Sequence, residues 1–260
     1  MQRQVAGIAL EQFHLAFLEA ATAQLPIDRF ALKGGANLRF FLRSLRRSVD
    51  MDFDYLGDPQ HSWAFAERVD KIFASNALQV LLRAREIALV SVRKPKQTDT
   101  TRRWRFSLNA PGVDGVPSKI EFSARARDRH AADYELAPVD AELARRLRAR
   151  PVRLYHYRPP ATIAQKIGAL RLRSETQPRD VFDLDHLFRE FPDALAAVAV
   201  PVEELQAAVE RARALSYDEY AGTVVPYLEE GIVEVLGTSE AWTQMQLRVV
   251  ERLEWKERQR

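Results

Sequence analysis

The chain has 260 residues, of which 47% are hydrophobic and 29% are charged, and its formal net charge is +3. This length allows one large domain or two small ones, and the composition is typical of a globular protein with a real core. No segment approaches the length of a membrane span, and the absence of cysteine excludes disulfides, thiolate zinc sites and cysteine nucleophiles. We therefore expect a cytoplasmic protein that does not enter a membrane.

The N-terminal part of the chain predicts an α+β fold. Helical and strand-like patterns alternate there. The predicted elements are a helix over 5–24, a short strand over 30–32, a helix over 36–45, a strand over 50–55, a helix over 61–75, a hairpin of strands over 86–93 and 102–108, and a strand over 118–123. This order predicts a mixed sheet with flanking helices, in a domain over residues 1–158.

Helical periodicity dominates the rest of the chain. The predicted helices are 161–174, 179–191, 202–215, 218–234 and 239–258. Pro226 should kink or divide the fourth of them, because proline removes a hydrogen bond from a helix interior. We interpret residues 159–260 as a helical C-terminal domain, a bundle that completes a site or forms a second unit.

Charge is unevenly distributed along the chain. Residues 83–105 contain eight basic residues against two acids, whereas residues 218–240 contain six acids and no base. A basic region either presents itself to a polyanion or consists of solvated arginines, and both interpretations stay open at this point.

The most informative residues are Asp50, Asp52 and Asp54, which occupy every second position of a predicted strand. Alternation along a strand puts the three carboxylates on one face. Neighbouring carboxylates repel each other, so an ordered strand seldom carries them unless a cation neutralises them. Mg²⁺ takes oxygen ligands of this kind and bridges them to substrate phosphates. An isolated Asp-x-Asp pair is a weak signal, since most such pairs are surface carboxylates.

A Lys33-Gly34-Gly35 turn precedes the acidic strand and strengthens this interpretation. Paired glycines let backbone N–H groups approach an anion closely, at the start of a predicted helix. The turn, one short helix and the acidic strand form a compact unit that brings the turn beside the carboxylates. A phosphate cradle next to a metal clamp predicts phosphoryl or nucleotidyl transfer.

Two residues further along the chain are candidates for the same site. Glu121 would join Asp50 and Asp52 if its strand pairs beside residues 50–55, which would supply the carboxylates of a two-metal site. Otherwise Glu121 is an exposed strand residue. Lys166 lies in an otherwise apolar helix, where it either extends to the surface or points at a triphosphate as a compact positive charge.

Two aspartates of the following helix complete the candidate set. Asp183 is four residues after Arg179, so the two could form an ordinary ion pair on one helical face. Asp180 is well placed at the start of its helix, where the helix dipole favours a negative charge.

Three blocks of this sequence occur together between residues 32 and 184. They are Lys33-Gly34-Gly35 continued by Arg46-x-Ser48-x-Asp50-x-Asp52-Phe53, then Lys119-Ile120-Glu121, and finally Lys166-x-x-Ala169-Leu170-x-x-Arg173 with Arg179-Asp180-x-x-Asp183-Leu184. The combination resembles the AbiEii/AbiGii toxin family of nucleotidyltransferases, within the DNA polymerase β-like superfamily. The chain departs from many superfamily members at Gly35, where a serine would offer a hydroxyl to a phosphate.

The resemblance implies Mg²⁺-dependent transfer of a nucleoside monophosphate from a nucleoside triphosphate to an acceptor hydroxyl, with release of pyrophosphate. The implied metal ligands are Asp50 and Asp52, with Glu121 on the strand that carries the superfamily's third acid. The implied phosphate-binding residues are Lys33, Gly34, Gly35, Arg46, Ser48 and Lys166. Asp180 or Asp183 would complete the site as the general base for the acceptor hydroxyl.

The resemblance also implies partners, namely a tRNA acceptor and a cognate antitoxin that counteracts growth arrest. Two alternatives stay open. The acceptor could be a protein or a small molecule without a toxin role, or the chain could be a non-catalytic RNA-binding module that uses the strand over 102–106. For that strand we favour an arrangement with Trp104, Phe106 and Leu108 in the core and the arginines in solvent.

Overall fold

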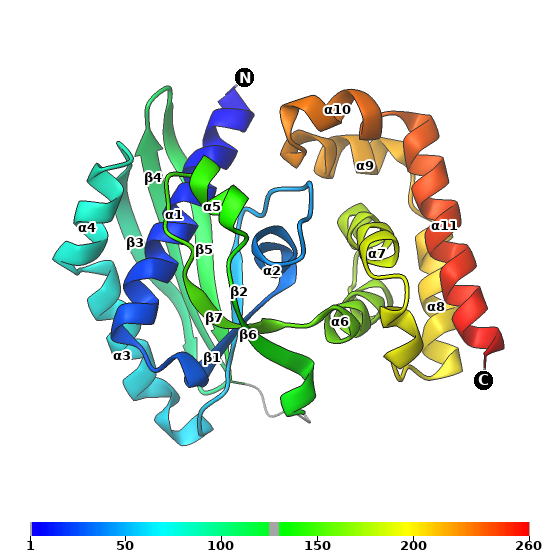
Figure 1. Ribbon diagram of the computed structural model, residues 1–260, viewed down its shortest axis with the longest axis horizontal. Coiled ribbons are helices and arrows are strands. Elements are labelled where there is room, and N and C mark those ends of the chain that lie inside the picture. Colours follow the sequence, from blue (N-terminus) through cyan, green and yellow to red (C-terminus); the bar gives the residue numbers. More distant parts are fainter. Residues whose placement is uncertain (1, 125–129, 260) are drawn as a thin grey trace. The chain divides into compact units, whose positions relative to one another are not determined.

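The computed structural model describes residues 2–124 and 130–259, and the chain divides into two compact units (Figure 1). The sheet unit comprises residues 1–43 and 47–157, and the helical unit comprises residues 44–46 and 158–260. Three residues between the Gly34-Gly35 turn and the acidic strand therefore belong to the helical unit, as does the chain from residue 158 onward. The sequence patterns did not predict the three-residue excursion.

A mixed sheet of seven strands forms the sheet unit in the described part of the chain, in the order β3-β4-β5-β2-β1-β7-β6. The strands are β1 (Phe30–Lys33), β2 (Met51–Tyr55), β3 (Ala88–Thr98), β4 (Thr101–Ala110), β5 (Val113–Ser123), β6 (Tyr134–Pro138) and β7 (Arg153–Tyr157). Strand β2 runs antiparallel to β1 and parallel to β5. This mixed sheet with its helices confirms the predicted α+β fold class.

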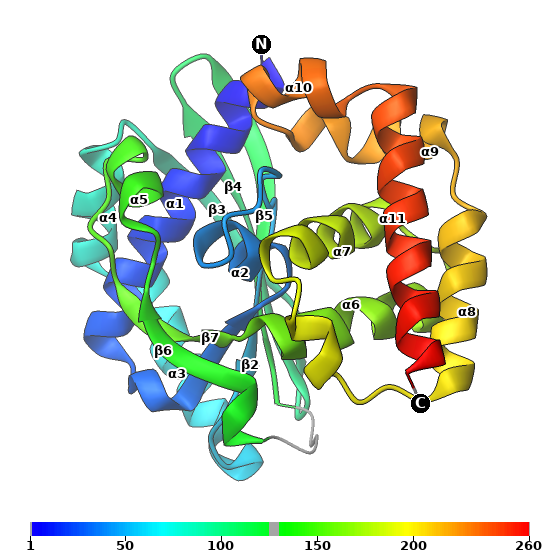
Figure 2. The same ribbon diagram turned by 45° about the vertical axis from the view of Figure 1, so that its right-hand side comes forward.

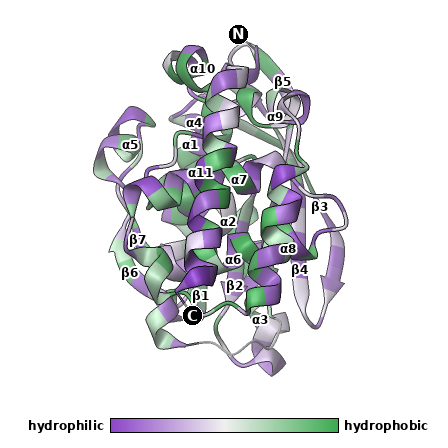
Figure 3. Cartoon of the chain, turned by 90° about the vertical axis from the view of Figure 1, so that its right-hand side faces the viewer, coloured by the Kyte–Doolittle hydropathy of each residue, from purple (hydrophilic) through white to green (hydrophobic). Residues whose placement is uncertain are grey.

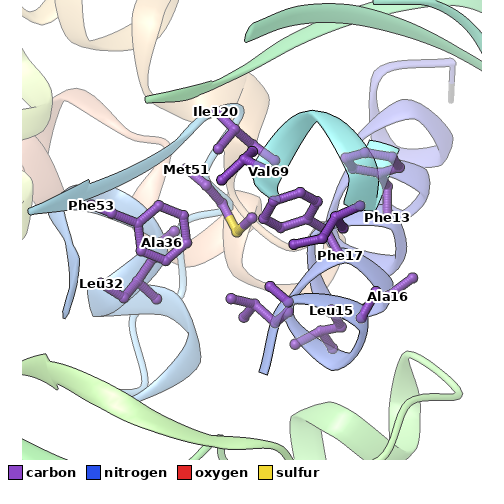
Figure 4. Close-up of a cluster of buried hydrophobic side chains, with 14 of the residues drawn as sticks. Phe13, Leu15, Ala16, Phe17, Leu32, Ala36, Met51, Phe53, Val69 and Ile120 are labelled. Atoms are coloured by element: carbon purple, nitrogen blue, oxygen red, sulfur yellow. The ribbon is translucent and has the colours of Figure 1, made fainter. Parts of the chain in front are cut away.

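Helices α1 (Gln2–Gln24), α3 (Ser62–Phe73) and α4 (Asn76–Arg83) cover one face of the sheet (Figure 1, Figure 2). The rings of Phe13 and Phe106 lie 4.4 Å apart between α1 and β4. Figure 4 shows Phe13 and Phe17 of α1 in one cluster with Val69 of α3 and the strand residues Met51 and Ile120. These side chains are buried and form the core of the unit.

The apolar side chains of β4 face the core, as the sequence analysis favoured. Trp104, Phe106 and Leu108 are all buried. Because side chains alternate along a strand, Arg103 and Arg105 lie on the opposite face. The expectation that the arginines are in solvent is wrong for Arg102, which is buried on the core side because its guanidinium packs 3.6 Å from the centre of the Trp63 ring.

Several boundaries differ from the sequence prediction. Helix α2 (Gly34–Phe40) ends five residues early, because Arg43 takes a positive φ of 58° and the next three residues join the helical unit. Strand β3 extends through the segment predicted as a turn, and an irregularity between Arg93 and Lys96 accommodates Pro95. The sequence prediction missed α4, β6, α5 (Ala141–Arg146) and β7.

The helical unit contains α6 (Pro159–Leu172), α7 (Pro178–Glu190), α8 (Val202–Arg213), α9 (Tyr217–Thr223), α10 (Glu230–Leu236) and α11 (Ser239–Arg258). Pro226 lies in a 3-10 turn between α9 and α10, so it divides the predicted helix as expected. Helices α8 and α11 lie side by side, with hydrophilic and hydrophobic residues interspersed along both (Figure 3). Among the described helices, none has both the length and the apolar character that crossing a membrane requires.

Short 3-10 turns complete the described secondary structure. They span Ile27–Arg29, Pro59–His61, Ala131–Asp133, Ala194–Ala197 and Val225–Tyr227.

Candidate active site

Two half-buried carboxylates converge on one ammonium group in the sheet unit. Nζ of Lys119 lies 2.9 Å from Oδ1 of Asp52 and 3.3 Å from Oδ2 of Asp50. Burial acts to lower the pKa of Lys119, but the charges of Asp52 and Asp50 outweigh it and raise the pKa, so the side chain stays cationic. The two carboxylates are therefore arranged around a single positive charge, as the ligands of a metal ion would be.

The glycine turn lies directly against this pair, as the sequence predicted. Gly34 has a φ of 70°, a left-handed conformation that glycine adopts without strain. A Cβ atom added at Gly34 would lie 3.6 Å from Oδ2 of Asp52, which shows how closely the turn approaches the carboxylate. The carboxyl end of β1 and the start of β2 thus place backbone N–H groups and carboxylates next to each other.

Glu121 is the sheet neighbour of Asp52, because β5 pairs with β2 in the register that the sequence analysis required. Its carboxylate, however, is bound to the guanidinium of Arg103 at 2.6 Å. Within residues 2–124 and 130–259 no group of three or more potential metal-ligating side chains occurs. The structure thus brings Glu121 beside Asp52 without aiming it at the point where Asp50 and Asp52 converge, and its metal role stays a prediction.

The third aspartate of the acidic run has a structural role. Asp54 is 2% exposed, and its oxygens accept hydrogen bonds from Nζ of Lys33 at 2.5 Å and from the hydroxyl of Tyr157 at 2.6 Å. These bonds join β1, β2 and β7 at the centre of the sheet. The ammonium group of Lys33, predicted to bind phosphate, is accordingly engaged with Asp54.

The loop before β2 is held by two consecutive arginines, each bound in a different unit. Within the helical unit, Arg46 bridges to Leu228 through its backbone and makes a bidentate ion pair with Asp183, with Nη2 2.9 Å from Oδ2. Within the sheet unit, Nε of Arg47 lies 3.3 Å from a carboxylate oxygen of Glu11 on α1.

Glu11 is 1% exposed and also binds Arg39 of α2 at 2.5 Å, so its negative charge serves two cations. The hydroxyl of Ser48 donates a hydrogen bond of 2.8 Å to the carbonyl of Asp50. Buried ion pairs and this bond determine the path of the loop into the acidic pair. Both Arg46 and Ser48, predicted near the triphosphate, make contacts that position the loop.

Lys166, Asp180 and Asp183 form one buried network in the helical unit. Nζ of Lys166 lies 2.9 Å from Oδ1 of Asp180 and 2.6 Å from Oδ2 of Asp183. Both carboxylates are fully buried. The predicted local pair between Asp183 and Arg179 is therefore replaced by pairs with Lys166 and with Arg46, which is distant in sequence.

The environment of Asp183 is unsuited to a general base. Burial alone would raise its pKa, but the charges and hydrogen bonds of Arg46 and Lys166 outweigh burial and hold the pKa at about 2. A base this weak accepts a proton poorly near neutral pH. Asp180 differs, because its Oδ2 atom makes no hydrogen bond with any described residue, although Nε of Arg173 lies 3.0 Å away. A catalytic role for Asp180 stays a prediction.

Sequence reasoning missed three residues that shape the site, namely Lys119, Arg103 and Glu11. The strand pattern gave a partial signal for the first two. Lys119 is two residues before Glu121 and so shares its strand face, and Arg103 lies between the apolar positions of its own strand. Glu11 gave no signal, since a single acid in an amphipathic helix is ordinarily a surface residue.

Comparisons with known proteins identify the family of the chain. The family model "Nucleotidyl transferase AbiEii toxin, Type IV TA system" matches residues 16–255, so the chain belongs to this family. Family membership implies a nucleoside triphosphate as substrate and an antitoxin as partner. No curated protein matches the chain.

Solved structures share the fold at low sequence identity. A protein from H. pylori described as a candidate nucleotidyltransferase has 15% identity and a TM-score of 0.59, over 100% of this chain and 96% of that one. JHP933 from Helicobacter pylori has 17% identity and a TM-score of 0.56, over 97% and 95% of the two chains. MenT4, a nucleotidyltransferase toxin from Mycobacterium tuberculosis H37Rv, has 16% identity and a TM-score of 0.52, over 98% and 85%.

We predict that Asp183→Asn destabilises the protein by about 3–5 kcal/mol at neutral pH, because it removes the buried negative charge that Arg46 and Lys166 share. The pKa of Asp183 is lower in the folded state than its ordinary value of 3.8. Its stabilising contribution is therefore complete above that value and is lost as the pH falls toward about 2.

Urea unfolding of both proteins from pH 7 to pH 2.5 measures this effect, with the exposed Asp193→Asn of the same unit as control. The free energies of unfolding of wild type and Asp183→Asn should converge as the pH falls. A gap that stays constant across this range would contradict the assignment of Asp183 as a buried anion.

Proposed function

We propose that this toxin transfers a nucleoside monophosphate from a nucleoside triphosphate to a hydroxyl of tRNA, with Mg²⁺ held by Asp50 and Asp52. One observation carries the proposal: these two carboxylates converge on a single cation directly beside the turn at Gly34. The donor set fits a hard divalent cation, since both ligands are carboxylates and both remain about one-third exposed. When bound, Mg²⁺ supplies charge neutralisation on the phosphates.

The reaction forms one bond and breaks one. The acceptor oxygen attacks the α-phosphorus, the α–β phosphoanhydride bond breaks, and pyrophosphate leaves with the electron pair of that bond. The hydroxyl proton passes to a base. Alignment and charge neutralisation supply most of the rate enhancement in phosphoryl chemistry, so the protein's task is mainly to hold groups in place.

In this proposal the chain contributes two kinds of contact and one positioning element. Asp50 and Asp52 hold the cation, and the backbone at Gly34 and Gly35 approaches the triphosphate. The anchored loop keeps Asp50 at its place. Lys33 and Lys166 are bound to carboxylates here, so a role for either at the phosphates requires exchange of an ion pair. A cytoplasmic location fits a tRNA acceptor.

The second candidate function is the same nucleotidyl transfer with a protein as the acceptor. Incubation with labelled nucleoside triphosphates, Mg²⁺, total tRNA and a cell extract separates the two, because the label then appears in either the RNA or the protein fraction. We expect it in the RNA fraction.

We predict that Asp50→Asn and Asp52→Asn each lower nucleotidyl transfer by about 100-fold or more, the scale of losing one charge-stabilising group in an active site. Both side chains are partly exposed, and exposed ion pairs contribute little to stability, so the fold should persist. Transfer of labelled nucleotide, with circular dichroism as a check of folding, measures the effect. The matched control is Asp114→Asn, an exposed aspartate of β5, and near wild-type transfer by Asp50→Asn would contradict the proposal.

We further predict that Lys119→Gln binds Mn²⁺ more tightly than wild type, by several-fold. The ammonium group occupies the point between Asp50 and Asp52, so it competes with a cation for the same oxygens. Electron paramagnetic resonance of free Mn²⁺ measures the dissociation constant without requiring turnover. Lys71→Gln, an exposed lysine of α3, is the control, and weaker binding by Lys119→Gln would place the metal elsewhere.

A further inference from the structure

Strands β3, β4 and β5 place basic side chains directly opposite one another. In the pairing of β3 with β4, Arg93 faces Arg105, and Lys96 faces Arg103. In the pairing of β4 with β5, Arg105 faces Lys119. All five lie on the sheet face opposite the core, because Trp104 and Phe106 point into the core.

Like charges that face each other across strands destabilise a sheet. Some of these charges are balanced within the fold, since Arg103 binds Glu121 and Lys119 binds the acidic pair. Arg93, Lys96 and Arg105 make no ion pair with any described residue. Arg93 and Arg105 are also exposed. The unbalanced pair of Arg93 and Arg105, beside the irregularity in this ladder, is thus unfavourable for folding, and no described ion pair of the sheet unit offsets it.

These cations continue the row of residues that contains the acidic pair. Register places Asp52 beside Glu121, Glu121 beside Arg103, and Arg103 beside Lys96. Neighbouring strands lie about 4.8 Å apart, so Arg103 is about 10 Å and Lys96 about 14 Å across the sheet from Asp52. The basic surface therefore begins within a few strand spacings of the proposed reacting atoms, on the same face.

We propose that Arg93, Lys96 and Arg105 form the docking surface for the phosphates of a single-stranded RNA end whose terminal hydroxyl lies at Asp50 and Asp52. This inference rests on the proposed function, which places the acceptor hydroxyl there. A nucleic acid carries a phosphate at every nucleotide, so a chain that leaves the acidic pair across β4 and β3 meets these cations in succession.

The contacts are to phosphate and carry no base readout. The aromatic residues of β4 lie on the core side, where they cannot stack on bases. Phosphate contacts position a nucleic acid and make its binding salt-dependent without selecting its sequence. The surface therefore orients the acceptor end, whatever its sequence.

The test compares Arg93→Gln/Arg105→Gln with Lys71→Gln/Arg83→Gln. Both double variants remove two exposed positive charges, but the second pair lies on helices α3 and α4, on the opposite face of the sheet. Fluorescence anisotropy with a labelled single-stranded oligoribonucleotide, in EDTA and without nucleoside triphosphate, measures affinity as a function of salt. Urea unfolding is measured on the same samples.

Arg93→Gln/Arg105→Gln should bind the RNA at least about tenfold more weakly at low salt, and its plot of log K against log salt should be shallower by about 1.4, or about 0.7 for each lost phosphate contact. Its unfolding midpoint should equal or exceed that of wild type, because a repulsive pair is gone. The control variant should bind like wild type. Equal affinity and equal salt slope in both double variants would overturn the proposal.

This binding assay does not depend on nucleotidyl transfer, because it contains neither Mg²⁺ nor nucleoside triphosphate. If Asp50→Asn retains transfer while Arg93→Gln/Arg105→Gln loses RNA affinity, the active-site assignment fails and the docking surface stands. If transfer depends on Asp50 but RNA affinity does not depend on the arginines, the docking surface fails and the active site stands.

Discussion

The alternation of side chains along β2 determines where the groups of the acidic site lie. Met51, Phe53 and Tyr55 are buried in the core, so the intervening aspartates must occupy the other face of the strand. A shift of one residue would bring carboxylates into the core and apolar side chains out of it, which fixes the register strongly. The pairing with β5 then brings Lys119 and Glu121 onto the same face. The acidic pair, the ammonium group of Lys119 between its carboxylates and the basic surface all lie on one face because of that register.

Buried ion pairs give the site its precision at the point where the backbone is irregular. The loop before β2 has no ladder to hold it, and its two arginines are instead bound to Asp183 in one unit and Glu11 in the other. Replacing such pairs with apolar residues is often neutral for stability, so stability alone does not explain them. Their effect here is geometric, because charge pairs with directional hydrogen bonds specify where the loop enters the acidic strand. Several residues of the family motif thus act by supporting the loop.

The amphipathic helices and the acidic strand were predictable because their periodicity is local. The pairing of β2 with β5 was only a condition under which Glu121 would join the acids, and the structure shows that pairing. Strand β7 was missed, because its burial comes from its neighbours β1 and β6 and its own sequence alternates weakly. Helix α2 was predicted to be too long, because residues 44–46 belong to the helical unit and do not continue the helix. Partner choice was the least predictable feature: Asp183 pairs with Arg46, which is 137 residues away, and not with the arginine one turn before it.

We propose that Asp50 and Asp52 hold the cation that binds the triphosphate. A crystal structure of the protein with Mg²⁺ and a non-hydrolysable nucleoside triphosphate is the decisive experiment. We expect Mg²⁺ between these two carboxylates, with Lys119 displaced from them and the phosphates against the backbone at Gly34 and Gly35. Metal and triphosphate bound elsewhere, with Lys119 still bridging Asp50 and Asp52, would contradict it.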